Sequence, residues 1–246
     1  QSVVSCAARG RPWCGPLVKA DRAEAVSVAD LSNWIEALRG LDGRCYELLG
    51  ESGAGWVERC EVYVRDAVSL WNLRNLLPIA GGRGGLVLRA DTAAGVPVVL
   101  KAPIANTTMH IAAQSELAGA GAGPRVIDAD VPRGLLLLEY IDGWPLPRPA
   151  DRTERRSVVG ALSKLHAHTT TYGFPLISDW LISRLADEPS DRSLASGVPG
   201  ERQRARASRT LVDLDAGNHT SAFIHADLNV GNLLRSAGGK TTLIDA

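Results

Sequence analysis

The stretch FIHADLNVGNLL, residues 223–234, decides how this chain is interpreted. It is an apolar run interrupted by His225, Asp227 and Asn232, which bring an imidazole, a carboxylate and an amide into one short segment. Their spacing fits the loop pattern H-R-D-x-x-x-x-N, in which the Asp accepts the proton of an acceptor hydroxyl and the Asn binds Mg²⁺. Ala226 stands in place of the Arg. The stretch therefore predicts a phosphoryl-transfer loop in which Asp227 is the catalytic base and His225 orients the loop.

The residues after this loop predict a β-hairpin that returns to it. We expect a strand over 232–235, a turn made by two glycines, and a second strand over 241–244. The second strand leads into Asp245, so the hairpin is expected to deliver this carboxylate beside the loop. Because Mg²⁺ prefers hard oxygen donors, Asn232 and Asp245 are the predicted metal ligands.

A lysine at the end of an apolar strand indicates where the phosphates of a nucleotide would bind. Lys101 ends the run VPVVLK, and a lysine on the inner face of a sheet needs a chemical reason. The alternative is a surface lysine whose stem lies along apolar residues. Glu116 follows fifteen residues later, in a predicted helix. An ion pair between the two side chains would hold Lys101 toward the α- and β-phosphates of ATP.

Two further stretches are predicted to contact the nucleotide. The segment GGRGG, 81–85, allows the backbone at Gly82 and Gly84 to approach it closely, although a plain turn fits equally well. The segment lacks the G-x-x-x-x-G-K-[ST] pattern of P-loop proteins. The run LLLLEYIDG would pass between two lobes, where the backbone of Glu139 and Ile141 is predicted to hydrogen-bond adenine. Together the motifs predict ATP and Mg²⁺ as cofactors.

Bulk composition narrows the class of protein. The chain has 246 residues, of which 45% are hydrophobic and 22% charged, and its formal net charge is zero. This balance is typical of a globular protein and favours neither nucleic acid nor a membrane as a partner. The apolar runs are too short to span a bilayer and no secretory signal is recognised, so we expect a cytoplasmic protein. The four cysteines lack the paired spacing of a zinc site and are expected to be free thiols.

The order of predicted elements indicates an α+β fold with two lobes. Residues 1–53 are interpreted as an N-terminal helical extension of unknown role, 54–141 as an antiparallel-sheet lobe, and 142–246 as a mainly helical, incomplete second lobe. Predicted helices cover 28–41, 56–73, 106–119, 151–167, 178–185 and 200–214, and predicted strands cover 86–90, 96–102, 125–130 and 134–141. The proline-rich segment 142–151 is predicted to be a linker, and Asp151 with Glu154 a capping box.

These motifs resemble the aminoglycoside phosphotransferase family, which has a protein-kinase-like fold. The likeness spans roughly residues 54–246 and is greatest to the streptomycin 6-kinase and hydroxyurea-type branch. It rests on SLWNL, VVLKAP, VIDADVPRGLLLLEYIDG, LSKLHAH, PLISDWL and HADLNVGN, in that order. The resemblance implies an ATP-dependent O-phosphotransferase that inactivates an aminoglycoside-like small molecule. It implies Asp227 as the base and Asn232 and Asp245 as Mg²⁺ ligands, and it makes Lys101 with Glu116 the phosphate clamp.

The end of the sequence and the shared chemistry keep other functions open. Members of the family continue after the metal-binding Asp with a Gly-Asp segment and helices that form much of the acceptor pocket, whereas this sequence stops one residue past Asp245. We therefore expect either a fragment or a truncated pseudokinase that binds nucleotide without transfer. A kinase of another metabolite, such as a sugar amine, choline or a macrolide, would use the same residues. A protein kinase is disfavoured, because the Arg of H-R-D is absent and Ala246 follows Asp245 in place of Phe-Gly.

Overall fold

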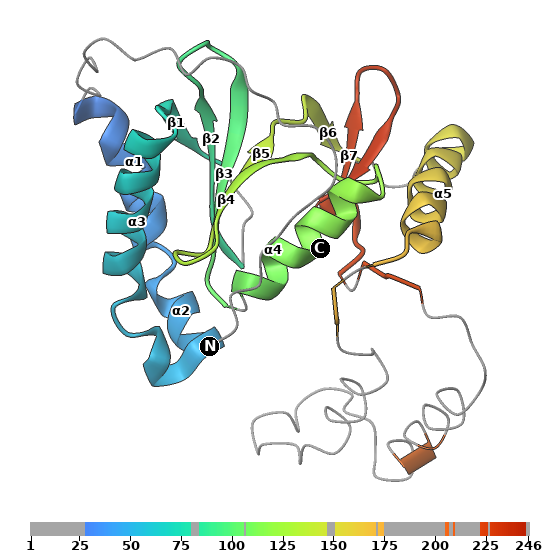
Figure 1. Cartoon of the computed structure of the whole chain (residues 1–246), viewed down its shortest axis with the longest axis horizontal. Helices are drawn as coiled ribbons and strands as arrows, with labels where there is room; N and C mark the ends of the chain where they lie inside the picture. Colours follow the sequence, from blue (N-terminus) through green and yellow to red (C-terminus); the bar gives the residue numbers. More distant parts are fainter. Residues whose placement is uncertain are drawn as a thin grey trace.

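The computed structural model describes residues 28–79, 84–105, 107–146, 151–170, 172–174, 205–206, 209, 222–225 and 227–244. Two groups of elements are visible in Figure 1. The first is a five-stranded sheet with helices on both faces, and the second is a three-stranded sheet beside the helix α5 (Arg152–Ala167). The predicted α+β architecture with an antiparallel-sheet first lobe is confirmed.

The five-stranded sheet is antiparallel, with the strand order β1-β2-β3-β5-β4. Its strands are β1 (Arg74–Pro78), β2 (Gly85–Asp91), β3 (Pro97–Pro103), β4 (Val126–Asp130) and β5 (Leu135–Glu139). The register shifts between Arg74 and Leu77 of β1 and between Val126 and Asp128 of β4, so both edge strands are irregular. Strands β2 to β5 agree with the predicted ones. β1 was not predicted, because the apolar run leading into the glycines reads as the approach to a turn.

One face of this sheet is covered by a layer of helices (Figure 1). The layer consists of α1 (Val28–Arg39), α2 (Asp42–Leu49), the 3₁₀ turn η1 (Gly50–Gly53) and α3 (Trp56–Leu70). Helices α1 and α3 agree with predicted helices, and both place buried side chains against the strands.

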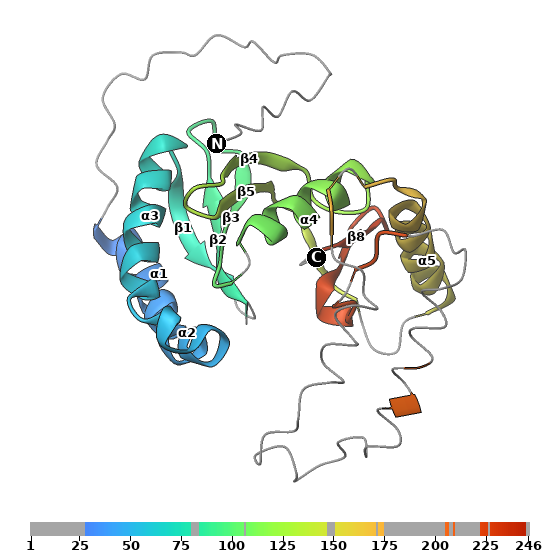
Figure 2. The same ribbon diagram turned by 60° about the horizontal axis from the view of Figure 1, so that its bottom comes forward.

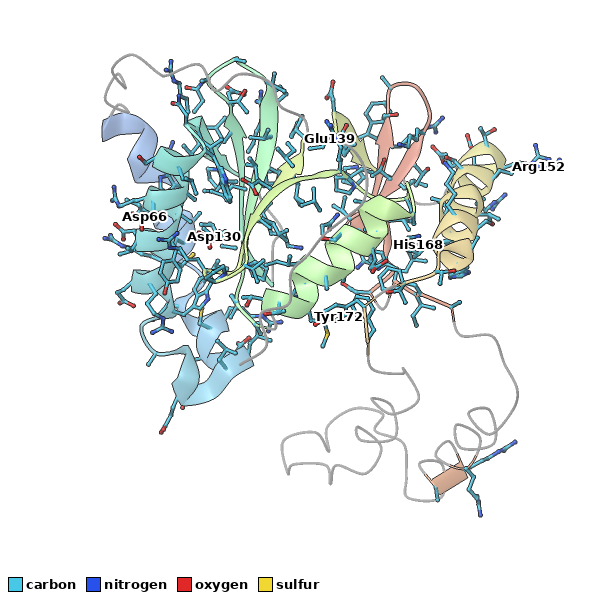
Figure 3. All side chains as sticks on the ribbon, viewed as in Figure 1. Asp66, Asp130, Glu139, Arg152, His168 and Tyr172 are labelled. Atoms are coloured by element: carbon cyan, nitrogen blue, oxygen red, sulfur yellow. The ribbon has the colours of Figure 1, made fainter. Side chains whose placement is uncertain are left out.

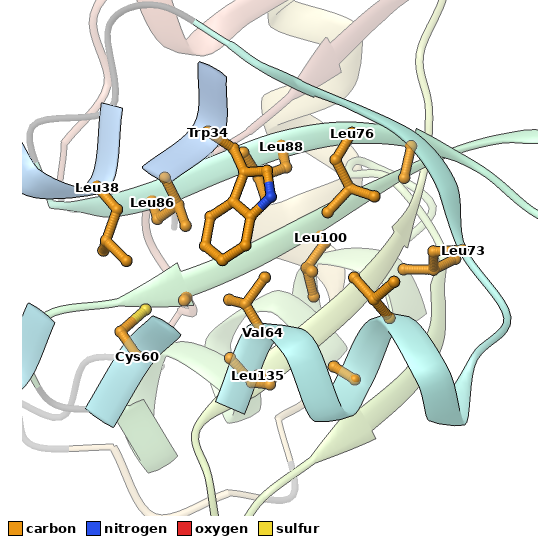
Figure 4. Close-up of a cluster of buried hydrophobic side chains, with 14 of the residues drawn as sticks. Trp34, Leu38, Cys60, Val64, Leu73, Leu76, Leu86, Leu88, Leu100 and Leu135 are labelled. Carbon is orange, nitrogen blue, oxygen red and sulfur yellow. The ribbon is translucent and has the colours of Figure 1, made fainter. Parts of the chain in front are cut away.

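The core between these helices and the sheet is continuous (Figure 4). Trp34 of α1 is fully buried and belongs to the same cluster as Leu88 of β2 and Leu100 of β3. The described part of the predicted N-terminal extension therefore shares the hydrophobic core of the sheet. Cys45 and Cys60 are free and buried in this core. Burial raises the pKa of the Cys60 thiol to about 12, which keeps it protonated.

The opposite face of the sheet packs on the helix α4 (Thr107–Gly119). Neighbouring residues on a strand point to opposite faces, so Leu136 and Leu138 of β5 pack with Ile111 of α4 while Leu135 and Leu137 belong to the first core. Burial on both faces explains why β5 is an unbroken run of leucines rather than an alternating pattern.

The second lobe contains the predicted hairpin and the predicted capped helix. Its antiparallel sheet has the order β6 (Gly143–Pro145), β7 (Leu233–Ser236) and β8 (Thr241–Leu243), and the turn η3 (Val230–Asn232) precedes β7. The Asp151 carboxylate accepts a hydrogen bond of 2.7 Å from the Glu154 N–H, and the Glu154 carboxylate accepts one of 2.7 Å from the Asp151 N–H. The capping box that begins α5 is therefore confirmed.

The prediction that residues 142–151 form a linker is wrong for their first part. Gly143–Pro145 pair with β7 as an edge strand. Gly143 permits this close approach, because a Cβ atom there would lie 2.7 Å from the Arg235 carbonyl oxygen. Pro145 is compatible with the strand because an edge strand leaves one side of its backbone unpaired.

Two predicted helices lie wholly or mostly outside the described residues. The predicted helix over 178–185 and most of that over 200–214 lie outside the described residues. The division of the chain after residues 53 and 141 stays a prediction. Within the described residues, no helix is long and apolar enough to cross a membrane.

We predict that Trp34→Ala lowers the free energy of unfolding by about 3–5 kcal/mol, the usual range for removing a large buried aromatic side chain. Chemical denaturation would measure this loss. The matched control is Glu36→Ala, an exposed position on the same helix. Equal stability of the two variants would show that α1 does not contribute to the core of the sheet.

A second stability prediction compares two adjacent glycines at the start of β2. A Cβ atom on Gly85 would lie 2.3 Å from the Ala102 carbonyl oxygen, whereas one on Gly84 would meet nothing within 4 Å. We expect Gly85→Ala to lower the free energy of unfolding by about 1–3 kcal/mol through overpacking. Gly84→Ala should leave it nearly unchanged. Urea denaturation of both variants tests the register of β2 on β3.

Candidate active site

His225 fixes the loop to the strand that leads toward Asp245. The imidazole is buried, and its Nε2 lies 2.7 Å from the Ile244 carbonyl oxygen. A carbonyl only accepts hydrogen bonds, so Nε2 carries the proton in this contact. The predicted orienting role of His225 agrees with this geometry.

The Asp227 carboxylate is exposed and is held by two amide side chains. Asn232 Nδ2 donates to Asp227 Oδ2 at 3.0 Å and to the Asp227 carbonyl oxygen at 2.9 Å. Asn229 Nδ2 donates to Asp227 Oδ1 and to the same carbonyl oxygen, both at 3.3 Å. Asn229 also accepts a hydrogen bond of 2.8 Å from the Gly231 N–H. The two asparagines therefore set the orientation of the predicted base.

Asn229 is a residue that the pattern H-x-D-x-x-x-x-N does not single out. Its role comes from a turn in which its side-chain oxygen binds the backbone two residues later, a local habit of asparagine. The asparagine following the Asp-Leu dipeptide was the available sequence signal.

The hairpin approaches the loop as predicted, up to the last described residue. The Ile244 N–H donates to the Asn232 carbonyl oxygen at 3.0 Å. The Leu243 N–H donates to the Ala122 carbonyl oxygen at 2.8 Å, which ties the hairpin to the chain after α4. Asp245 itself lies outside the described residues, so its role as a metal ligand stays a prediction.

The donor set around Asn232 fits a magnesium ion in part. Because Asn232 donates through Nδ2 to Asp227, its Oδ1 is the atom left to serve as a ligand. Among the described residues, no three His, Cys, Asp or Glu side chains form a group that could hold a metal.

Lys101 lies on β3, and its predicted partner Glu116 lies on α4, the helix that packs on this sheet. Lys101 is 8% exposed and pairs in register with Leu136, which places it on the sheet face that packs on α4. Glu116 lies on α4, where its Oε2 is 2.6 Å from Nε2 of His168. The ion pair between Lys101 and Glu116 stays a prediction. His168, which follows the end of α5, was not predicted to take part in the site.

The other predicted nucleotide contacts are at the strand ends around this face. The Gly84 carbonyl oxygen accepts a hydrogen bond of 2.9 Å from the Ile104 N–H, while Gly82 lies outside the described residues. The Glu139 N–H already donates to the Arg125 carbonyl oxygen at 2.9 Å. A contact of Glu139 with adenine would therefore use its carbonyl at the end of β5, and Ile141 lies two positions later; both contacts stay predictions.

The chain belongs to the phosphotransferase enzyme family, whose sequence profile matches residues 75–245. Similar solved structures include a choline/ethanolamine kinase family protein from Mesorhizobium loti, with 23% identity, a TM-score of 0.51 and coverage of 69% of this chain and 57% of that one. Choline kinase LicA from Streptococcus pneumoniae has 18% identity and a TM-score of 0.53, and the match covers 75% of this chain and 67% of that one. An amicoumacin kinase has 13% identity and a TM-score of 0.52, with 75% and 63% covered.

These similarities establish the fold. The predicted kinase-like architecture is confirmed, and the chain spans 57% of the length of the Mesorhizobium loti protein. No curated protein matches the sequence.

We predict that His225→Phe lowers the free energy of unfolding by about 1–3 kcal/mol, because the Ile244 carbonyl loses its donor while the ring volume is kept. His225→Gln, whose amide nitrogen lies near the position of Nε2, should recover most of this loss. Urea denaturation of the two variants measures the difference. Equal destabilisation by Phe and Gln would mean that ring packing, not the hydrogen bond, holds the loop.

Proposed function

We propose that this chain is an ATP-dependent O-phosphotransferase whose acceptor is an aminoglycoside-like small molecule. The observation that carries the proposal is the geometry of Asp227. Its carboxylate is exposed, it is oriented by Asn229 and Asn232, and it lies on a loop that His225 ties to the hairpin before Asp245. An oriented, accessible carboxylate is what the acceptor hydroxyl of a phosphoryl transfer needs.

In the proposed reaction, an acceptor hydroxyl attacks the γ-phosphorus of ATP while its proton moves to the Asp227 carboxylate. The bond between the γ-phosphorus and its bridging oxygen breaks, and ADP leaves with the electron pair. Lys101 would balance the charge of the α- and β-phosphates. Asn232 and Asp245 would hold Mg²⁺, which supplies further neutralisation of the phosphates. Catalysis by the chain would consist of positioning and electrostatic stabilisation.

The resemblance to the streptomycin 6-kinase and hydroxyurea-type branch supports an antibiotic acceptor. The similar fold of an amicoumacin kinase, solved in complex with AMP-PNP, Ca²⁺ and Ami, is compatible with this class. On this proposal the protein inactivates the antibiotic in the cytoplasm, where ATP is available.

A second candidate is a kinase of a small metabolite. The choline/ethanolamine kinase family protein and choline kinase LicA have the same fold at slightly higher identity than the amicoumacin kinase. Both candidates use Asp227 and Lys101 in the same roles, so the acceptor alone separates them. A screen of streptomycin, kanamycin, a macrolide, choline and a sugar amine for transfer of labelled γ-phosphate would identify the class.

We predict that Asp227→Asn lowers the rate of phosphate transfer by about 10²–10⁴-fold, the usual contribution of a positioned general base. The dissociation constant for Mg-ATP should stay within about twofold of the parent value, since Asp227 is assigned to the acceptor side. Transfer of labelled phosphate and calorimetric titration measure the two quantities. The control variant is Glu36→Ala, which removes an exposed carboxylate in α1, a helix far from Asp227 in the sequence.

Three outcomes separate the candidate functions. Transfer that depends on Asp227 supports a kinase. Binding of Mg-ATP without transfer to any acceptor supports a nucleotide-binding pseudokinase. If the folded chain shows no thermal shift at a high concentration of Mg-ATP, where about 100 times the dissociation constant should add roughly 2.7 kcal/mol, the assignment of a nucleotide site is wrong.

A further inference from the structure

A hydrogen bond between the two lobes joins the residue that follows α5 to the last turn of α4. His168 Nε2 lies 2.6 Å from Glu116 Oε2, and the two residues are 52 positions apart in the sequence. Figure 3 shows His168 at the end of α5 that comes beside α4. Because a carboxylate accepts, Nε2 carries the proton in this contact. The exposed side-chain fractions are 11% for Glu116 and 23% for His168, so water screens the bond only in part.

The His168 ring lies against α4 at Gly119, one helical turn after Glu116. A Cβ atom on Gly119 would lie 3.3 Å from Cε1 of this ring, tighter than nine in ten real Cβ contacts. The absence of a side chain at Gly119 therefore lets the imidazole lie against the helix backbone. From the other side, the His168 N–H donates to the Leu165 carbonyl oxygen at 3.1 Å, which fixes where the residue leaves α5.

Apolar packing around the bond keeps the two helices together. Ala113 and Leu117 of α4 belong to one buried cluster with Ala161 and Leu165 of α5. Ala113 and Leu117 lie three positions before and one position after Glu116, so the carboxylate emerges beside an anchored part of the helix. The hydrogen bond from His168 fixes the position of one oxygen of the Glu116 carboxylate, which the apolar packing alone would not do.

We propose that His168 is a positioning residue, which holds the Glu116 carboxylate in the orientation that allows it to pair with Lys101 when ATP binds. This inference rests on the proposed function, because Lys101 and Glu116 form a clamp only if a nucleotide is bound there. A carboxylate has two oxygens, so Glu116 can accept from His168 at Oε2 and from Lys101 at the same time. Lys101 lies on the sheet face toward α4, which is the side from which it would reach Glu116.

The inference predicts a selective loss of nucleotide affinity. We expect His168→Ala to weaken Mg-ATP binding and to raise KM for ATP by about tenfold, the effect of losing one charge-assisted hydrogen bond. KM for the acceptor should be unchanged. His168→Gln, whose amide nitrogen lies near the position of Nε2, should restore most of the affinity, while His168→Asn, whose amide is too short, should resemble His168→Ala. His166→Ala is the matched control, since His166 is exposed and lies two positions earlier in α5.

A double-mutant cycle separates positioning through Glu116 from a general contribution of His168 to folding. In a Glu116→Ala background, His168→Ala should cause no further loss of Mg-ATP affinity, because the group it positions is gone. Calorimetric titration with Mg-ATP measures all four proteins, and thermal unfolding checks that each is folded. If His168→Ala destabilises the chain too far, His168→Asn takes its place in the cycle.

The outcomes distinguish failure of the positioning role of His168 from failure of the proposed kinase function. Loss in the parent background, rescue by Gln and no further loss in the Glu116→Ala background support the positioning role. Unchanged affinity in His168→Ala, or additive losses in the cycle, overturn it while leaving the proposed kinase function intact. Absence of Mg-ATP binding in the parent chain overturns the proposed function and the positioning role together.

Discussion

Helix α4 belongs to two hydrophobic clusters at once, and the arrangement of the lobes depends on this double attachment. Ile111 packs on β5 of the first sheet, while Leu117 packs with Leu165 of α5 and Leu243 of β8. In Figure 2 the helix lies between the five-stranded sheet and the elements β8 and α5. The carboxylate of Glu116 sits on this shared helix, so the geometry of both lobes determines where it points.

A short series of contacts connects this helix to the loop that carries Asp227. The carbonyl of Ala122, just after α4, receives the Leu243 N–H, and the next residue, Ile244, contacts both Asn232 and His225. The orientation of Asp227 is thus linked through β8 to the chain that leaves α4. Groups from distant parts of the sequence are therefore held together by hydrogen bonds to and between main-chain groups.

Much of this arrangement could be predicted from local sequence. Several features are encoded within a few residues: the H-x-D-x-x-x-x-N spacing, the glycine turn of the hairpin and the Asp151 capping box. The run of leucines in β5 likewise indicates a strand that is buried on both faces. Three features depend on contacts distant in sequence and were not predicted. The strand β6 depends on Gly143, which allows the close approach of β7. Helix α1 belongs to the core of the sheet because Trp34 is buried in one cluster with residues of β2 and β3. His168 contacts Glu116 because the fold brings the end of α5 beside α4. Asn229 was missed for another reason, since its side chain acts on a turn too short to leave a periodic signal.

The irregular edges of the five-stranded sheet bear on how the protein behaves in concentrated solution. An unpaired, flat edge strand offers its backbone to strands of other molecules and so promotes aggregation. Here the outer strand β4 carries Asp128 and Asp130 beside its register shift, and β1 has a register shift and ends in Pro78. Carboxylates and a proline are poor partners for an incoming strand. The sheet that presents Lys101 is therefore protected at both sides against edge-to-edge growth into fibrils, without needing another chain to cover it.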